Sequence, residues 1–194
     1  EADKKSLYEA HRRFLQFLQW RHAAEQWILK GPSHLSMLPD LFATYPDAHI
    51  VVTHRDPVRG LGSLGSIIAA MISMRSQVVD RSLCIQLQAA ASPMMLDQYM
   101  KCRDSGELPE EQITDIRYID LVSNPIETVS GLYERLGRRL GSDAQARMKR
   151  WLAAKSSKPA APHRHRFDDT GLDREVERAK YRAYMQRFEL PEEV

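Results

Sequence analysis

The stretch HIVVTHRDP, residues 49–57, decides the fold class. Residues 49–54 are apolar and β-branched almost without interruption, which is typical of a strand buried on both faces of a parallel sheet. Asp56 and Pro57 are residue types that begin helices, as N-cap and first helical residue, so a helix to about residue 77 is expected. A buried strand that leads directly into a helix indicates an α/β protein.

The rest of the chain repeats this alternation. Residues 27–30 predict a buried strand that ends at Lys30, and residues 113–118 predict a third strand. Apolar residues at helical spacing predict further helices over residues 4–24, 33–41, 81–101, 125–140, 142–155 and 173–188. We therefore expect a single domain over residues 1–194, with a three-layer, mostly parallel sheet flanked by helices.

Two details of the predicted helices suggest neighbours. In the first helix Leu7, Phe14 and Leu18 form an apolar face that is expected to lie against another part of the molecule. In the helix after residue 56, glycines at positions 60, 62 and 65 are unfavourable by ~1 kcal/mol each relative to alanine, so a close neighbour or ligand is expected there.

Composition excludes several classes of partner. The 28 Lys and Arg residues against 26 Asp and Glu give a net charge of +2, which predicts neither a nucleic acid nor an anionic membrane as partner. The uncharged stretch 60–74 is shorter than the ~20 residues of a membrane span. Cys84 and Cys102 match neither a disulfide framework nor a zinc motif, so no metal is predicted and a cytoplasmic location fits best.

Functional side chains gather where the predicted strands end. Lys30, Arg55 and Tyr118 each stand at or near such an end, and ligands of α/β sheets bind beyond the carboxyl ends of the strands. The guanidinium of Arg55, the hydroxyl of Ser63 and the start of the intervening helix suit a phosphate group. The alternatives are ordinary helix-start chemistry, a small packing residue at 63, a solvated lysine at 30 and a tyrosine at the edge of the core.

Three rival classes follow from the same residues. His54 and Asp56 with His163 or His165 match the two-His, one-carboxylate iron site of oxygenases, although the helix-rich pattern opposes it. A kinase-like P-loop protein would need a GxxxxGK[ST] loop, which the chain lacks. A non-catalytic nucleotide-binding or protein-interaction adaptor is the third class.

The order of several motifs resembles the sulfotransferase superfamily, particularly its bacterial branch. They are WILKGPSH (27–34), VVTHRDP (51–57) with Ser63, IRYIDL (116–121), LYERLG (132–137), and RF (166–167) with GLD (171–173). The resemblance covers residues 27 to about 188. It implies a P-loop NTPase-like sulfotransferase fold and transfer of a sulfuryl group from 3′-phosphoadenosine 5′-phosphosulfate (PAPS) to a hydroxyl or amine of a small-molecule acceptor, leaving adenosine 3′,5′-bisphosphate (PAP).

The resemblance also implies roles for five residues. Arg55 and Ser63 match the pair that holds the 3′-phosphate of the donor in relatives, and Tyr118 matches a position that contacts adenine. Lys30 matches a lysine near the bridging oxygen, where negative charge grows as the bond to sulfur breaks. His34 is a candidate general base, although it follows the lysine by four residues rather than the two of relatives.

Two further expectations come from the resemblance. The basic run at residues 163–166 is a candidate loop over the 3′-phosphate. Relatives also carry a loop for the 5′-phosphosulfate after their first strand, and nothing before residue 27 resembles it. We therefore expect the C-terminal part of a sulfotransferase domain, which lacks its first strand and alone transfers sulfate poorly.

Overall fold

The computed structural model describes residues 4–21, 25–156 and 167–193. The chain divides into two compact units, one made of Glu1–His49 with Met94–Gln112 and the other of Ile50–Pro93 with Ile113–Val194. In the described parts of both units, no helix combines the length and the apolar character that a membrane crossing needs.

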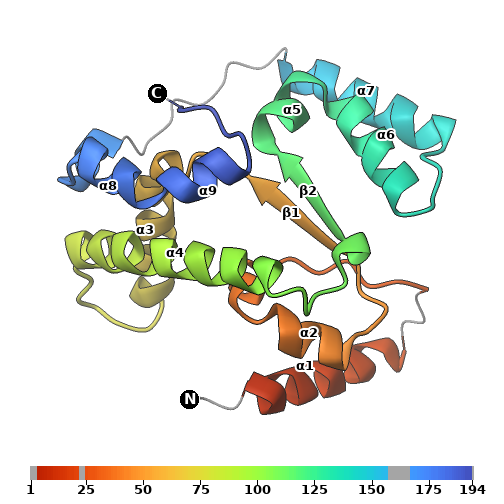
Figure 1. The fold of residues 1–194 in the computed structure, drawn as a ribbon, viewed down its shortest axis with the longest axis horizontal. Helices are drawn as coiled ribbons and strands as arrows, with labels where there is room; N and C mark the ends of the chain where they lie inside the picture. Colours follow the sequence, from red (N-terminus) through yellow and green to blue (C-terminus); the bar gives the residue numbers. More distant parts are fainter. Residues whose placement is uncertain (1–3, 22–24, 157–166, 194) are drawn as a thin grey trace. The chain divides into compact units, whose positions relative to one another are not determined.

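The second unit contains a small parallel sheet. Strand β1 (Ile50–His54) pairs with β2 (Ile113–Arg117), with Ile50 opposite Ile113 and His54 opposite Arg117, so their carboxyl ends lie side by side (Figure 1). The predicted helix-rich α/β class with a parallel sheet is confirmed. Burial alternates along β1, and the strand is not buried on both faces as predicted, because Val52 is buried and Val51 is 39% exposed.

Helix α3 (Pro57–Ser73) follows β1 as predicted and ends about one turn earlier than expected. Asp56 is its N-cap, because its side chain accepts a hydrogen bond from the backbone N–H of Val58. Helix α4 (Arg81–Asp104) is the close neighbour expected beside the glycines of α3. A Cβ at Gly65 would lie 3.0 Å from the Cα of Ile85 and closer still to its side chain. A Cβ at Gly60 would meet open space.

Short helices complete the second unit. Helices α5 (Tyr118–Ser123) and α6 (Pro125–Arg135) lie beside β2 (Figure 1). α6 ends before the predicted residue 140 because Gly137 adopts a φ of 65°, a conformation that glycine permits after a helix. The others are α7 (Ser142–Ser156), the 3-10 turn η3 (Phe167–Thr170), α8 (Arg174–Lys180) and α9 (Arg182–Arg187).

The first unit is helical. It contains α1 (Lys4–Gln19), the 3-10 turn η1 (Pro32–Ser36), α2 (Leu38–Thr44), the end of α4 and the 3-10 turn η2 (Glu110–Gln112). α1 contacts α2, and its buried residues are Tyr8 and Leu15.

The prediction that α1 lies against another element is confirmed by its contact with α2, but the predicted face is not the buried one. Leu7, Phe14 and Leu18, the expected packing face, are 53%, 60% and 38% exposed. Helical periodicity locates an apolar face without saying whether a partner covers it, and the tyrosine at position 8 directs the neighbouring face inward.

The predicted strand at residues 27–30 is also wrong. Residues 26–30 form no regular structure, and Ile28 is 90% exposed. A strand needs a hydrogen-bonded neighbour, and in the part of the chain that the structure describes β1 and β2 pair only with each other.

Candidate functional site

Two of the predicted site residues meet at the carboxyl edge of the sheet. Arg55 follows β1 and Tyr118 follows β2, and the paired register places these positions next to each other. The guanidinium carbon of Arg55 lies 4.2 Å from the centroid of the Tyr118 ring, which is a cation–π contact. We call the group of Arg55, Asp56, Tyr118, Arg178 and Glu193 the arginine rim.

Asp56 is the buried centre of the arginine rim. It is 1% exposed, and besides capping α3 at 3.0 Å its carboxylate accepts from Arg178 Nη2 at 3.1 Å and from the backbone N–H of Glu193 at 2.9 Å. One carboxylate thus connects the start of α3 to α8 and to the segment after α9. Such a network holds the backbone at Arg55 in a fixed position.

Arg55 itself forms an ion pair. Its Nε and Nη2 atoms donate to the carboxylate of Glu193, with the shortest contact at 2.6 Å. The hydrogen bond to Glu193 raises the pKa of Arg55 above its ordinary value, against a smaller opposing effect of burial. The guanidinium is therefore charged and engages an anion through its planar fork.

Beside the arginine rim, His54 forms a buried hydrogen-bonded group. It is fully buried, with Nδ1 2.7 Å from the Tyr184 hydroxyl, Nε2 2.8 Å from Asp115 Oδ1 and its ring stacked on Phe188. Both ring nitrogens have protein partners, which argues against His54 as an iron ligand. His163 and His165, the other proposed ligands, lie outside the described residues, as does the rest of the basic run at 163–166.

Ser63 lies in the same unit as Arg55. It is exposed on α3, between the first turns of the helix and the packed glycine at 65. The buried positions of α3 are Val58, Leu61, Gly62, Gly65 and Ala69. Ser63 is therefore on the solvent face of the helix and is not a packing residue.

Lys30 and His34 lie in the first unit. Lys30 is exposed in the segment without regular structure, and His34 belongs to the turn η1. The structure thus groups Arg55, Ser63 and Tyr118 in one unit and Lys30 with His34 in the other, with a direct contact between Arg55 and Tyr118.

His34 has partners in a group of rings. Its Nδ1 is 2.7 Å from the hydroxyl of Tyr8, and the ring of His11 lies nearby, with Nδ1 2.7 Å from the hydroxyl of Tyr45. Burial, and then the proximity of His11, lowers the pKa of His34 below its ordinary 6.5. Burial, then Asp40 and Tyr45, raises the pKa of Tyr8 to about 12. Near neutral pH His34 and Tyr8 are therefore both uncharged.

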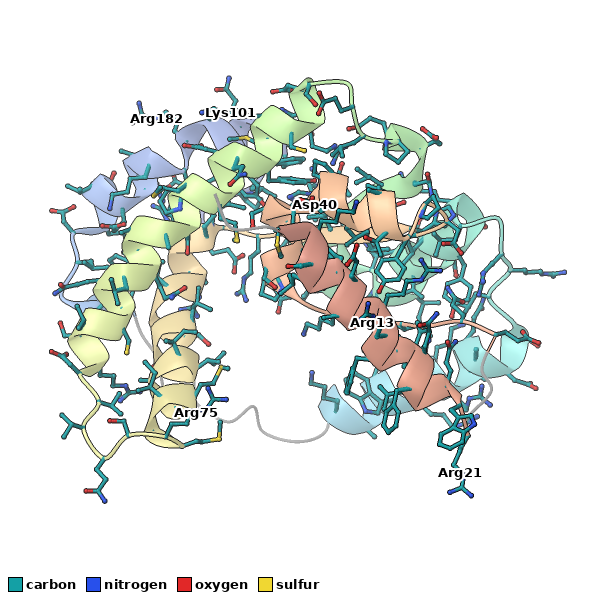
Figure 2. All side chains as sticks on the ribbon, turned by 90° about the horizontal axis from the view of Figure 1, so that it is seen from below. Arg13, Arg21, Asp40, Arg75, Lys101 and Arg182 are labelled. Carbon is teal, nitrogen blue, oxygen red and sulfur yellow. The ribbon has the colours of Figure 1, made fainter. Side chains whose placement is uncertain are left out.

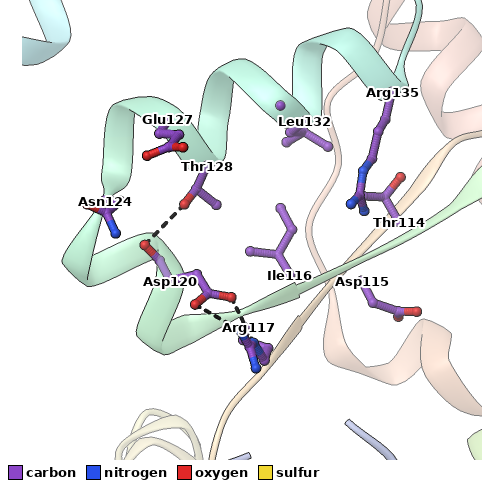
Figure 3. A pocket seen from close by; sticks show the side chains of 11 residues that line it. Thr114, Asp115, Ile116, Arg117, Asp120, Asn124, Glu127, Thr128, Leu132 and Arg135 are labelled. Atoms are coloured by element: carbon purple, nitrogen blue, oxygen red, sulfur yellow. Dashed lines mark hydrogen bonds and ion pairs between the residues drawn. The ribbon is translucent and has the colours of Figure 1, made fainter. Parts of the chain in front are cut away.

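A cavity of about 480 Å³ lies beside β2, with α5 and α6 as its other walls (Figure 3). None of the five predicted site residues lines it. Its charged side chains have both signs, and Arg117 donates to Asp120 at 2.8 Å. With three carboxylates against two arginines, this cavity has no excess of positive charge.

Other cations are spread over many elements. Figure 2 shows Arg13 on α1, Arg75 beyond α3, Lys101 on α4 and Arg182 on α9, all of which are exposed. Exposure alone therefore does not single out Arg55. Its neighbours do, because it combines a strand end, a capped helix start, an aromatic ring and a bound carboxylate.

A match to a protein-family model identifies the family of this chain. The model of the sulfotransferase family matches residues 2–142. The chain belongs to the sulfotransferase family. The predicted superfamily is thereby confirmed, on a match that includes the segments around Lys30, Arg55 and Tyr118.

Two solved structures resemble this sulfotransferase family member. The sulfotransferase STF9 from Mycobacterium avium is 28% identical with a TM-score of 0.80, and the match covers 98% of this chain and 48% of that one. The sulfotransferase STF1 from Mycobacterium tuberculosis H37Rv is 27% identical with a TM-score of 0.67, covering 94% and 46%. The chain thus spans about half the length of these sulfotransferases. No curated protein sequence matches it.

Sequence reasoning missed most of the partners around Arg55. It did not assign Arg178 or Glu193 to the arginine rim, because neither forms a motif with position 55. For His54 and Asp115 a signal existed, since each is a polar residue that directly adjoins β-branched residues of a predicted strand. Such residues are buried only when their hydrogen bonds are satisfied.

Proposed function

We propose that this chain is the C-terminal part of a cytoplasmic sulfotransferase domain that transfers a sulfuryl group from PAPS to a hydroxyl or amine of a small-molecule acceptor. Family membership supports the reaction class. The observation that carries the assignment of the donor is the arginine rim, where Arg55 lies beside Tyr118 at the capped start of α3.

The chemistry of Arg55 fits the 3′-phosphate of the donor. Its fork already binds a carboxylate through two nitrogen atoms, and phosphate oxygens accept the same pattern of hydrogen bonds. The helix start adds partial positive charge. Ser63, exposed on the same helix, would donate its hydroxyl to the phosphate, and Tyr118 would contact the adenine.

Lys30 and His34 are assigned to the transfer itself. The donor, when bound, supplies the activated sulfuryl group. Lys30 would place its ammonium where negative charge grows on the bridging oxygen. His34 would accept the proton of the acceptor at Nε2, which requires Nδ1 to carry the ring proton and to donate it to the hydroxyl oxygen of Tyr8. A pKa below 6.5 keeps the ring unprotonated near neutral pH.

Thermal unfolding of the 194-residue chain tests the donor assignment. A ligand that binds only the native state raises the midpoint, and we expect adenosine 3′,5′-bisphosphate to raise it more than ATP does. Arg55→Ala should abolish the difference. Arg117→Ala is the matched control, because Arg117 stands at the end of β2 and pairs with Asp120. Equal shifts with both nucleotides, or an unchanged shift in Arg55→Ala, would contradict the proposal.

A further inference from the structure

An acidic side chain of the protein occupies the fork of Arg55. Glu193 Oε1 is 2.8 Å from Nε, and Oε2 is 2.9 Å from Nε and 2.6 Å from Nη2. The guanidinium carbon also lies 4.2 Å from the centroid of the Tyr118 ring. The edge that carries Nε and Nη2 is therefore already filled by a carboxylate, in the same two-atom geometry that a phosphate would adopt.

The segment around Glu193 is held in place by several bonds. The backbone N–H of Glu193 donates to Asp56 Oδ2 at 2.9 Å, and Arg178 Nη1 donates to Glu192 Oε2 at 2.8 Å. Asp56, the residue next to Arg55 in the chain, thus ties down the backbone that carries the competing carboxylate. Because of this tether, the Glu193 carboxylate has a high effective concentration at Arg55.

We propose that Glu193 is an internal competitor for the 3′-phosphate site, so that its carboxylate leaves the Nε and Nη2 edge of Arg55 when the nucleotide binds. This inference rests on the proposed function of Arg55. Two anions on one edge of a guanidinium repel each other, and a phosphate carries more charge than a carboxylate. The competition weakens nucleotide binding, and return of Glu193 to Arg55 favours release of the bisphosphate product.

A role of Glu193 in orienting Arg55 would change the nucleotide affinity in the opposite direction. If Glu193 instead oriented the fork so that the phosphate bound the remaining Nη1 edge, its removal would loosen Arg55 and weaken binding. The sign of the change in affinity therefore separates competition from orientation.

Isothermal titration with adenosine 3′,5′-bisphosphate measures that sign. We expect Glu193→Gln to lower the dissociation constant about threefold, the size of effect given by a partly exposed ion pair. Glu192→Gln is the matched control. It makes the same change of charge one residue away, on a side chain that contacts Arg178 and not Arg55, and should leave the constant near that of the unchanged chain.

The binding results of the variants distinguish failure of the competition from failure of the proposed function. In an Arg55→Ala background Glu193→Gln should have no effect, because the competed group is gone. Binding that depends on Arg55 but is unchanged or weakened by Glu193→Gln overturns the competition alone. Binding that Arg55→Ala leaves intact, or no binding by the unchanged chain and by Glu193→Gln alike, overturns the proposed function and the competition with it.

Discussion

The arginine rim and the segment around Lys30 carry equally recognisable motifs, yet their local structures differ. At the rim, β1, the start of α3, α8 and the segment after α9 converge on Asp56. The backbone of residues 26–30 has no regular structure, and the turn η1 that follows holds His34 against the hydroxyl of Tyr8. The local structure of a binding motif therefore depends on its buried partners as much as on its own residues.

Removing Asp56, the buried centre of the arginine rim, is expected to have the largest effect on stability. Asp56→Ala removes a helix cap and leaves the partly buried Arg178 without one of its carboxylates, so we expect a loss of about 3 kcal/mol. Urea unfolding measures it. Asp173→Ala is the control, because Asp173 caps α8 through two exposed hydrogen bonds, and it should cost about 1 kcal/mol. Equal losses would show that the rim network adds nothing beyond capping.

Two glycines of α3, the helix that begins at the arginine rim, differ in the space around them. Gly65→Ala places a Cβ against the backbone and side chain of Ile85, and overpacking of this kind should cost about 2 kcal/mol. Gly60→Ala adds the same methyl group where space is open, so it should stabilise the helix by about 0.5–1 kcal/mol. Thermal or urea unfolding gives both values. A loss at position 60 would mean that the start of α3 is more crowded than the structure shows.

The smallest effect is expected in the first unit and depends on pH. Because the pKa of His34 in the folded chain is below 6.5, the unfolded chain binds more protons in the window just below pH 6.5, and stability falls as the pH decreases through that window. His34→Gln should make the urea midpoint less sensitive to pH between about 7 and 5. His49→Gln, at an exposed position, is the control. An unaltered pH dependence in His34→Gln would remove His34 from the titration.

The sequence predicted the rim better than the surroundings that hold it. The strand at 49–54, the cap at Asp56 and the approach of Arg55 to Tyr118 all follow from local signals and from the parallel pairing of two strands. Arg178 and Glu193 escaped prediction because their contacts with positions 55 and 56 span more than a hundred residues and leave no periodic pattern.

The errors have one physical cause. The apolar run at 27–30 and the face of α1 that carries Phe14 both predict a buried environment. An apolar pattern indicates which residues favour burial, but they are buried only if another part of the protein packs on them. The structure shows Ile28 and Phe14 exposed. The assignments of Lys30, His34, Ser63 and Tyr118 to donor and acceptor chemistry stay predictions for the binding experiments.

The contact between His54 and Tyr184 has a consequence for synthesis. Tyr184 follows its partner by 130 residues, and Asp115 by 61, so a growing chain on the ribosome makes β1 long before the groups that hydrogen-bond its buried imidazole. Until α9 has emerged, that imidazole must stay hydrated. The strand pair is therefore expected to close only after translation has passed α9, and a nascent chain arrested earlier should remain sensitive to protease at β1.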